Sequence, residues 1–146
     1  MAEMPNPNQQ NNVVLTHFIV SNDIDRSVDF YTRILGGELV KHIDGGPSGI
    51  VQFANSWIII NGGGGPTDDK PGVTLEVPTD PTRTSAFLNI RVADIQAVYA
   101  KWSALGAEFL TEPKDRGQEI RCYLRDPDGH LIEVGQSTAG SASSPD

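Results

Sequence analysis

The stretch "THFIVSNDIDRSVDFYTRILGG", residues 16–37, sets the fold because it joins a short apolar strand to an amphipathic helix. Its apolar residues recur at steps of four, three and four, which predicts one buried helical stripe. They are Ile24, Val28, Tyr31 and Leu35. Asn22 or Asp23 is a candidate N-cap, and Gly36 stands where a helix commonly ends in a left-handed residue. The stretch therefore predicts the opening of a strand–helix module.

The same pattern returns in "FLNIRVADIQAVYAKWSALGAEF", residues 87–109. A second stripe is formed by Ile95, Val98, Trp102 and Leu105. Matching positions lie 72, 71 and 70 residues apart, and these pairs are His17 and Asn89, Ile24 and Ile95, and Glu38 and Glu108. This near-constant spacing predicts that the chain is a tandem repeat.

Three short β-rich segments follow each helix. In the first half they are "ELVKHI" 38–43, "IVQFA" 50–54 and "WIIIN" 57–61; in the second half "EFLTEP" 108–113, "EIRCYLR" 119–125 and "HLIEVGQ" 130–136. The last two are joined by Asp-Pro-Asp-Gly, residues 126–129, a sequence typical of a tight turn. Each half is thus predicted to be a βαβββ module, and the fold class is α+β.

Composition limits the classes of function. A chain of 146 residues suits one domain, and no apolar run approaches the ~20 residues that cross a bilayer. The net charge of −8 argues against nucleic acid and anionic membranes as partners. A single cysteine, Cys122, excludes an internal disulfide and fits a reducing compartment. The start of the chain lacks the pattern of a secretory signal, so a cytoplasmic location is expected.

The two ends of the chain are small, polar and dotted with proline, which predicts disorder at 1–12 and at 137–146. The remainder, 13–136, is predicted to be a single domain. Its expected parts are module one at 13–61, a connecting loop at 62–85 and module two at 86–136. The loop is longer than most connections, which is typical of a linker or a lid, and "VTLEV" within it is a candidate strand.

Strand alternation predicts which side chains face away from the helices. Glu133 lies between Ile132 and Val134, so it is expected on the face opposite to these apolar neighbours. Cys122 is expected on the apolar, helix side. The residues predicted to face away from the helices are Leu15, His17, Ile19, Phe87, Asn89, Arg91, Arg121, Tyr123, Leu131 and Glu133, with Arg125 as a further candidate.

The duplicated unit, together with "YLRDPDGHLIEVGQ" at 123–136, resembles the vicinal oxygen chelate superfamily over about 13–136. This group includes glyoxalase I, extradiol dioxygenases, fosfomycin-resistance enzymes and bleomycin-binding proteins. The resemblance implies a glyoxalase-like fold, in which two modules form a cupped, incomplete mixed β-barrel with the helices outside. It also implies a small molecule inside the cup and assembly as a homodimer. It does not identify the reaction, since this fold hosts several chemistries.

Members of the superfamily place metal ligands on the first and last strands of each module. Carried over by position, the ligands are His17, Asn89 and Glu133, while Ile59 and Ile60 offer no fourth ligand. The resemblance implies a divalent ion such as Mn, Fe, Ni, Zn or Mg. An asparagine carbonyl is a hard oxygen donor, which suits Mg²⁺ or Mn²⁺ better than Zn²⁺ or Ni²⁺. A cup without metal stays open as the alternative.

Arginines facing the cup of an acidic protein indicate an anionic small molecule, because a guanidinium binds carboxylate or phosphate through two parallel bonds. The candidate substrate-binding residues are Arg91, Arg121, Tyr123, Phe87 and Trp57. Alternatively, Arg91 or Arg121 neutralises Glu133.

Two functions remain open from the sequence. The first is an enzyme with metal-dependent lyase/isomerase or dioxygenase-like chemistry, in which Glu133 is a ligand or, without metal, a general base. The second is a metal-free binding or sequestering protein of the bleomycin-resistance type.

Overall fold

The computed structural model describes residues 12–42 and 48–138. The chain forms two compact units, divided between Thr79 and Asp80, and each is described by itself. The predicted disordered ends, 1–12 and 137–146, lie outside the described residues apart from Asn12, Ser137 and Thr138.

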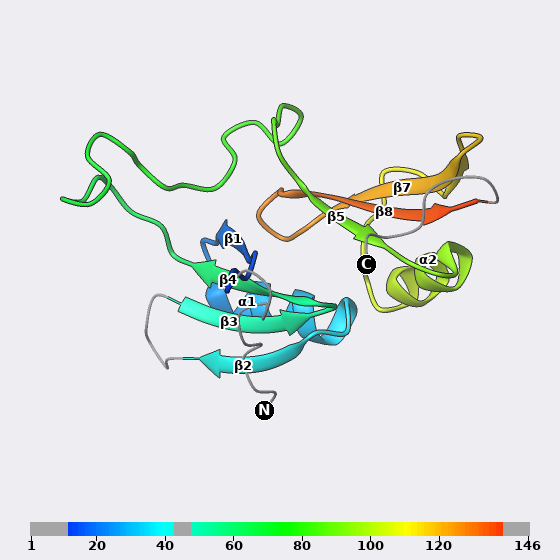
Figure 1. The fold of residues 1–146 in the computed structure, drawn as a ribbon, viewed down its shortest axis with the longest axis horizontal. Coiled ribbons are helices and arrows are strands. Elements are labelled where there is room, and N and C mark those ends of the chain that lie inside the picture. Colours follow the sequence, from blue (N-terminus) through cyan, green and yellow to red (C-terminus); the bar gives the residue numbers. More distant parts are fainter. Residues whose placement is uncertain (1–11, 43–47, 139–146) are drawn as a thin grey trace. The chain divides into compact units, whose positions relative to one another are not determined.

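The first unit contains one mixed sheet of four strands with the order β1-β4-β3-β2 (Figure 1). Strand β1 is parallel to β4, and the other neighbours are antiparallel. The elements are β1 His17–Val20, α1 Ile24–Asp29, the π-helical turn η1 Phe30–Ile34, β2 Glu38–His42, β3 Ser48–Phe53 and β4 Ser56–Asn61.

The second unit repeats this topology with the order β5-β8-β7-β6. Strand β5 is parallel to β8, and the other neighbours are antiparallel. Its elements are β5 Leu88–Arg91, α2 Ile95–Ala104, β6 Lys114–Asp115, β7 Glu119–Arg125 and β8 Leu131–Ser137. The predictions of two βαβββ modules and of an α+β fold class are therefore confirmed.

Two predicted strands are wrong. The segment "EFLTEP" makes only an isolated bridge, from Phe109 to Leu124, and the two-residue β6 follows it. The segment "VTLEV" likewise makes one bridge, from Leu75 to Gly64. Strand β8 also runs to Ser137, one residue beyond the predicted end of module two.

The helix caps follow the sequence pattern. Asp23 accepts a hydrogen bond from the amide of Arg26 at 3.1 Å, and Asp94 accepts one from Ala97 at 3.1 Å. Gly36 follows the first helix with a φ of +89°, which a side chain would strain. Among the described residues, no helix is both long and apolar enough to span a membrane.

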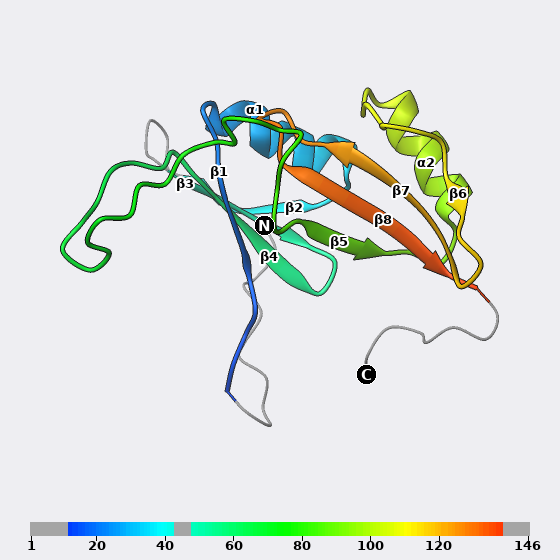
Figure 2. The ribbon, with the colours of Figure 1, turned by 90° about the horizontal axis from the view of Figure 1, so that it is seen from above.

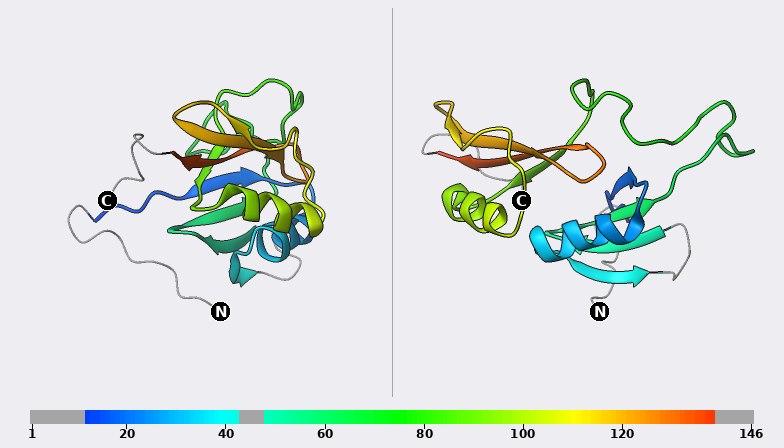
Figure 3. Two further views of the ribbon diagram at one scale, coloured as in Figure 1. Left: turned by 90° about the vertical axis from the view of Figure 1, so that its right-hand side faces the viewer. Right: turned by 180° about the vertical axis from the view of Figure 1, so that it is seen from behind.

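Each helix covers one face of its own sheet (Figures 2 and 3). In the second unit the covered face consists of two rows of paired residues, Leu88–Ile132–Leu124 and Ile90–Val134–Cys122. All but Leu88 are buried, and they form the core together with Ile95 and Trp102 of α2. The face turned away from the helix is called the open face below. Because side chains alternate along a strand, residues between these apolar positions lie on the open face.

The hairpin between β7 and β8 is fixed by Asp126, which is 4% exposed. Its carboxylate accepts hydrogen bonds from the amides of Asp128 and His130, both at 2.9 Å. Gly129 takes the left-handed conformation, with a φ of +96°. The turn predicted from Asp-Pro-Asp-Gly is confirmed, and it sets the register in which Tyr123 lies opposite Glu133.

Replacement of Asp126 by alanine is expected to lower the free energy of unfolding by about 2 kcal/mol, since two partly buried amides lose their acceptor. Urea denaturation measures this change. Asp115→Ala is the control, because Asp115 also accepts from an amide, that of Gly117 at 2.9 Å, but is exposed. Equal losses in the two variants would show that the turn does not depend on Asp126.

Candidate functional site

A polar cluster surrounds Glu133 on the open face of the second sheet. Strand β8 is central, and its Glu133 pairs with Asn89 on β5 and with Tyr123 on β7. The Tyr123 hydroxyl donates to Glu133 Oε1 at 2.6 Å, and Asn89 Nδ2 donates to Oε2 at 2.8 Å. Arg91 Nη1 lies 3.5 Å from the same Oε2. Both carboxylate oxygens are thus held by side chains of the flanking strands.

Alternation explains how this cluster forms. Ile132 and Val134 face the core and are 0% exposed, which places Glu133 between them on the opposite face. Glu133 itself is only 6% exposed. A buried carboxylate is costly unless it is hydrogen-bonded and paired, and Glu133 has both kinds of partner. The prediction that alternation brings Asn89 and Glu133 to one face is confirmed.

Next to this cluster lies a chain of ion pairs. Arg91 Nη1 is 3.0 Å from Glu119 Oε1, and Arg121 Nη1 is 3.6 Å from Glu119 Oε2. Arg91 and Arg121 pair with Gly135 from its two sides. A Cβ atom built on Gly135 would stand 2.0 Å from Arg91 Nη1. The Arg91 guanidinium therefore lies over the main chain of β8, in space that only glycine leaves free.

Aromatic rings adjoin the other side of the cluster. The rings of Phe87 and Tyr123 are 6.1 Å apart between centroids, in an edge-to-face arrangement. Phe87 is 42% exposed. On β7, Arg125 has a buried Nε without a hydrogen-bond partner among the described residues. The open face therefore offers apolar, acidic and basic groups within a few residues of each other.

The carboxylate affects its neighbour. The hydrogen bond to Glu133 raises the pKa of the Tyr123 hydroxyl, because ionisation would break that bond, and burial and the negative charge of Glu133 act in the same direction. Tyr123 is thus a hydroxyl donor over the physiological pH range.

Five of the predicted residues gather on this face, and two others belong to the first unit. Phe87, Asn89, Arg91, Tyr123 and Glu133 form the cluster, and Arg121 joins it through Glu119. Two residues of the cluster were absent from the sequence-based set, Glu119 and Gly135. The alternation of β7 and β8 contains the signal for both, since 119, 121 and 123 share one face, as do 133 and 135.

The predicted orientation of His17 is wrong. His17 pairs with Ile58, and Ile58 pairs with Val51, so the three share one face of the first sheet. Val51 is 0% exposed, and a Cβ on Gly37, just after the first helix, would stand 2.6 Å from its Cγ1. His17 therefore lies on the helix-covered face, and the expected inward orientation of Ile19 is wrong for the same reason.

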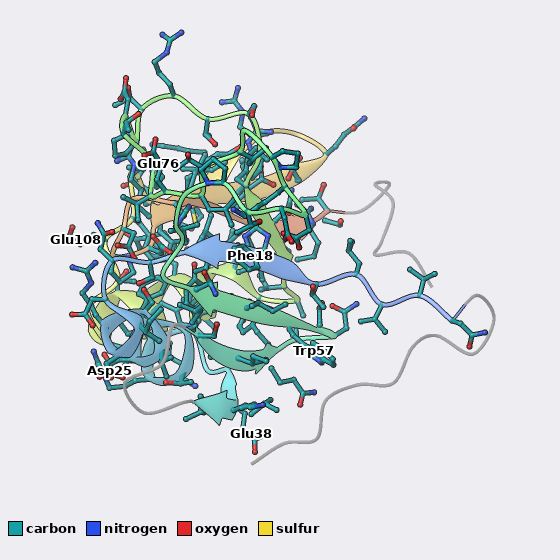
Figure 4. The ribbon with its side chains drawn as sticks, turned by 90° about the vertical axis from the view of Figure 1, so that its left-hand side faces the viewer. Phe18, Asp25, Glu38, Trp57, Glu76 and Glu108 are labelled. Atoms are coloured by element: carbon teal, nitrogen blue, oxygen red, sulfur yellow. The ribbon has the colours of Figure 1, made fainter. Side chains whose placement is uncertain are left out.

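The open face of the first sheet carries apolar residues where the second sheet carries Asn89 and Glu133. Phe18 pairs with Ile59 there, as Asn89 pairs with Glu133 in the second unit. Phe18 is 46% exposed. Trp57 shares this face by alternation with Ile59, and its buried indole Nε1 has no hydrogen-bond partner among the described residues. Figure 4 shows Phe18 on β1 and Trp57 at the start of β4.

The residues of the second unit do not fit a divalent ion. Asn89 turns its amide Nδ2, a donor, towards Glu133, and the cation Arg91 lies beside Oε2. Within residues 12–42 and 48–138, no three side chains of His, Cys, Asp or Glu come together in a way that would hold a metal. The ligand set of His17, Asn89 and Glu133 is divided between the two units and stays a prediction.

Comparison with known proteins identifies the family. Residues 12–134 match the Glyoxalase/Bleomycin resistance protein/Dioxygenase superfamily, and the chain belongs to it. It is 29% identical to a lactoylglutathione lyase of Pseudomonas putida, over 80% of each chain. It is 26% identical to a probable lactoylglutathione lyase of Vibrio parahaemolyticus, over 90% of this chain and 96% of that one.

Solved structures confirm the glyoxalase-like fold. A glyoxalase/bleomycin resistance protein/dioxygenase from Nocardioides superposes with a TM-score of 0.69 at 18% identity, covering 99% of this chain and 91% of that one. The fosfomycin resistance protein FosX from Listeria monocytogenes superposes with a TM-score of 0.63 at 19% identity, covering 87% and 94%. At these identities the similarity concerns the fold alone.

Tyr123 is expected to lose its proton above the ordinary tyrosine pKa of about 10. In Glu133→Gln this pKa is expected to fall, because the charged acceptor is gone. Because folding raises the pKa of Tyr123, the hydrogen bond to Glu133 stabilises the folded protein. This contribution to the free energy of unfolding is fully present below the pKa of tyrosine in the unfolded chain, and it is lost as the pH rises through the pKa of Tyr123 in the folded chain. NMR of ¹³Cζ-labelled tyrosine measures the titration, with the Tyr99 signal as control. An unchanged Tyr123 curve in Glu133→Gln would contradict the hydrogen bond.

Cys122 is expected to react slowly with a thiol reagent at pH 8. Burial raises the pKa of its thiol to about 11, so little thiolate is present. Labelling with a disulfide reagent, with and without urea, measures this. Rapid stoichiometric labelling of the folded protein would show that the helix-side core around β7 opens readily.

Proposed function

We propose that the protein acts on a small anionic molecule bound at the open face of the second sheet, and that Glu133 is the group that exchanges a proton with it. The observation that carries this proposal is the Glu133 carboxylate itself, held on a polar face by Tyr123 and Asn89. A core strand has no structural need for a buried carboxylate, since an apolar residue there would avoid the cost of its desolvation.

The chemistry of the surrounding side chains supports an anionic ligand. Arg91 and Arg121 keep 34% and 36% of their side chains exposed. Guanidinium groups bind carboxylate and phosphate oxygens through directional hydrogen bonds. Phe87 and Tyr123 add an aromatic surface for the apolar part of such a molecule. Trp57, on the open face of the first sheet, stays a predicted contributor to binding.

The relatives support lyase or isomerase chemistry for the enzyme. Two of them are called lactoylglutathione lyases, at 26% to 29% identity. For a base in reach of a substrate, proton transfer contributes typically 10²–10⁴-fold to the rate. The Tyr123 hydroxyl lies 2.6 Å from Glu133 Oε1. When the Glu133 carboxylate takes up a proton, the new O–H group can donate a hydrogen bond to the oxygen of Tyr123.

Glu133→Gln is expected to lower turnover roughly 100-fold or more while anion binding stays within a few-fold, because the glutamine keeps the shape and loses the base. S-lactoylglutathione is the first probe, with binding measured by calorimetry and turnover by exchange of the proton on the carbon next to the thioester carbonyl for deuterium in D₂O. Glu108→Gln is the matched control, as Glu108 is exposed in the same unit (Figure 4). Equal turnover by wild type and Glu133→Gln would contradict the role of Glu133.

A second candidate function is metal-free binding or sequestration. It is favoured by the saturation of Glu133, whose two oxygens already accept from Tyr123, Asn89 and Arg91. In that case the wild-type protein binds its ligand without turning it over, and Glu133 fixes Tyr123 and Asn89 rather than reacting. The same calorimetry and turnover measurements separate the two functions.

Metal-assisted chemistry through His17, Asn89 and Glu133 is the alternative mechanism, and members of the superfamily commonly use divalent metals. Because the donors around Glu133 do not fit an ion, we expect well below one ion per chain after dialysis of the untagged protein against Mn²⁺, Fe²⁺, Ni²⁺ and Zn²⁺ in turn. Elemental mass spectrometry measures this. About one ion per chain, lost in Glu133→Ala, would establish the metal site instead.

Family members often dimerise, and a homodimer in the cytoplasm is part of the proposal. The domain boundaries at 13–61, 62–85 and 86–136 likewise stay proposals.

A further inference from the structure

The carboxylate of Glu119 bridges two arginines. One oxygen lies 3.0 Å from Arg91 Nη1, and the other lies 3.6 Å from Arg121 Nη1. This is the arrangement that the carboxylate or phosphate group of a ligand would adopt between two guanidinium groups. The chain thus supplies an anion of its own at the place where the proposed function requires one from the ligand.

The site is built for a compact anion. Arg91 and Arg121 flank Gly135, and the absence of a Cβ atom lets the Arg91 guanidinium lie over β8. Any other residue at 135 would push Arg91 away, as a Cβ would stand 2.0 Å from its Nη1. Gly135 therefore allows the Arg91 guanidinium to lie close to the main chain of β8. Arg121 is paired with Gly135 from the opposite side.

Glu119 and Glu133 differ in how firmly they are held. The side chain of Glu133 is 8% exposed and bonded by Tyr123 and Asn89 as well as by Arg91. The side chain of Glu119 is 29% exposed, and its partners are the two arginines. Glu119 is also the first residue of β7, whereas Glu133 lies inside β8. Of the two carboxylates, Glu119 is the one that an incoming anion can replace.

We infer that Glu119 is an internal competitor for the anionic group of the ligand, which binds between Arg91 and Arg121 as the Glu119 side chain swings out. The inference rests on the proposed function and deepens it, since it assigns the anion to these two arginines. Arg91 also lies 3.5 Å from Glu133 Oε2, so an anion bound there has its substituent next to the Glu133–Tyr123 pair.

Competition by Glu119 affects every anion alike. Each ligand must replace an ion pair that is already formed, so the apparent affinity for any anion falls by the same factor, which is set by how often Glu119 leaves the two arginines. A dianionic phosphate interacts more strongly with two guanidinium groups than a monoanionic carboxylate does. The site is therefore expected to favour phosphate over acetate, and removal of the Glu119 charge is expected to tighten the binding of both.

The test is calorimetric titration of the full chain with inorganic phosphate and with acetate, at constant ionic strength. Glu119→Gln is expected to bind phosphate roughly two- to fivefold more tightly than wild type, the range expected for release of a partly exposed ion pair. Glu108→Gln removes one negative charge elsewhere in the second unit, as Glu119→Gln does at the site. It is expected to leave the affinity for phosphate unchanged. In Glu119→Gln/Arg121→Gln the gain is expected to vanish.

Two results would overturn the inference. If wild type binds phosphate and Glu119→Gln binds it equally or more weakly, Glu119 is not a competitor, while the proposed function stands. If no protein binds either anion, both the inference and the proposed function fail. Should Glu119→Gln not fold, Glu119→Asp replaces it. The shorter side chain is expected to lose the longer contact, that to Arg121, and to tighten phosphate binding as well.

Discussion

One buried carboxylate constrains the arrangement of side chains on the open face of the second sheet. Glu133 lies on the central strand β8, and its neighbours on both sides donate to it, Tyr123 from β7 and Asn89 from β5. The cost of burying this charge is offset only when all these donors are in register. The turn at Asp126 and the parallel pairing of β5 set that register, and the glycine at 135 leaves space for the Arg91 guanidinium.

The two modules share a topology and differ in the chemistry of their open faces. The pair Phe18–Ile59 occupies the place in the first sheet that Asn89–Glu133 occupies in the second. At this place the first module has two apolar residues, and the second has a hydrogen-bonded carboxylate. On the covered faces the two modules are alike at the last strand, where β4 has Ile58 and Ile60 and β8 has Ile132 and Val134. Packing against the helix fixes the fold, and the open faces are free to diverge.

Much of this was predictable from the sequence because helices and strands have simple periods. The βαβββ repeat, the caps at Asp23 and Asp94 and the open-face position of Glu133 follow from local patterns. The position of His17 was predicted wrongly because the repeats were matched there with an offset of 72. The helices give 95 − 24 = 71, and this offset matches Asn89 with Phe18, since 89 − 18 = 71. A slip of one residue turns every side chain of a strand to the other face.

The sequence could not predict the ion pairs. Which arginine reaches Glu119 and which reaches Glu133 depends on side-chain paths across three strands and on the space left by Gly135. Local patterns carry no such information, and for the same reason the choice between ligand binding and neutralisation stayed open for Arg91. The structure shows that Arg91 pairs with both carboxylates, and Arg121 with Glu119.

The central claim is that the ligand binds at the open face of the second sheet, and chemical-shift mapping tests it most directly. Backbone amide spectra of the ¹⁵N-labelled full chain would be followed as inorganic phosphate is added. The account predicts that the shifts concentrate at Phe87 and at the strand residues 88–91, 119–123 and 133–137, which contain the cluster. Saturable shifts confined to the first unit or to the connecting loop, with none on these strands, would contradict it.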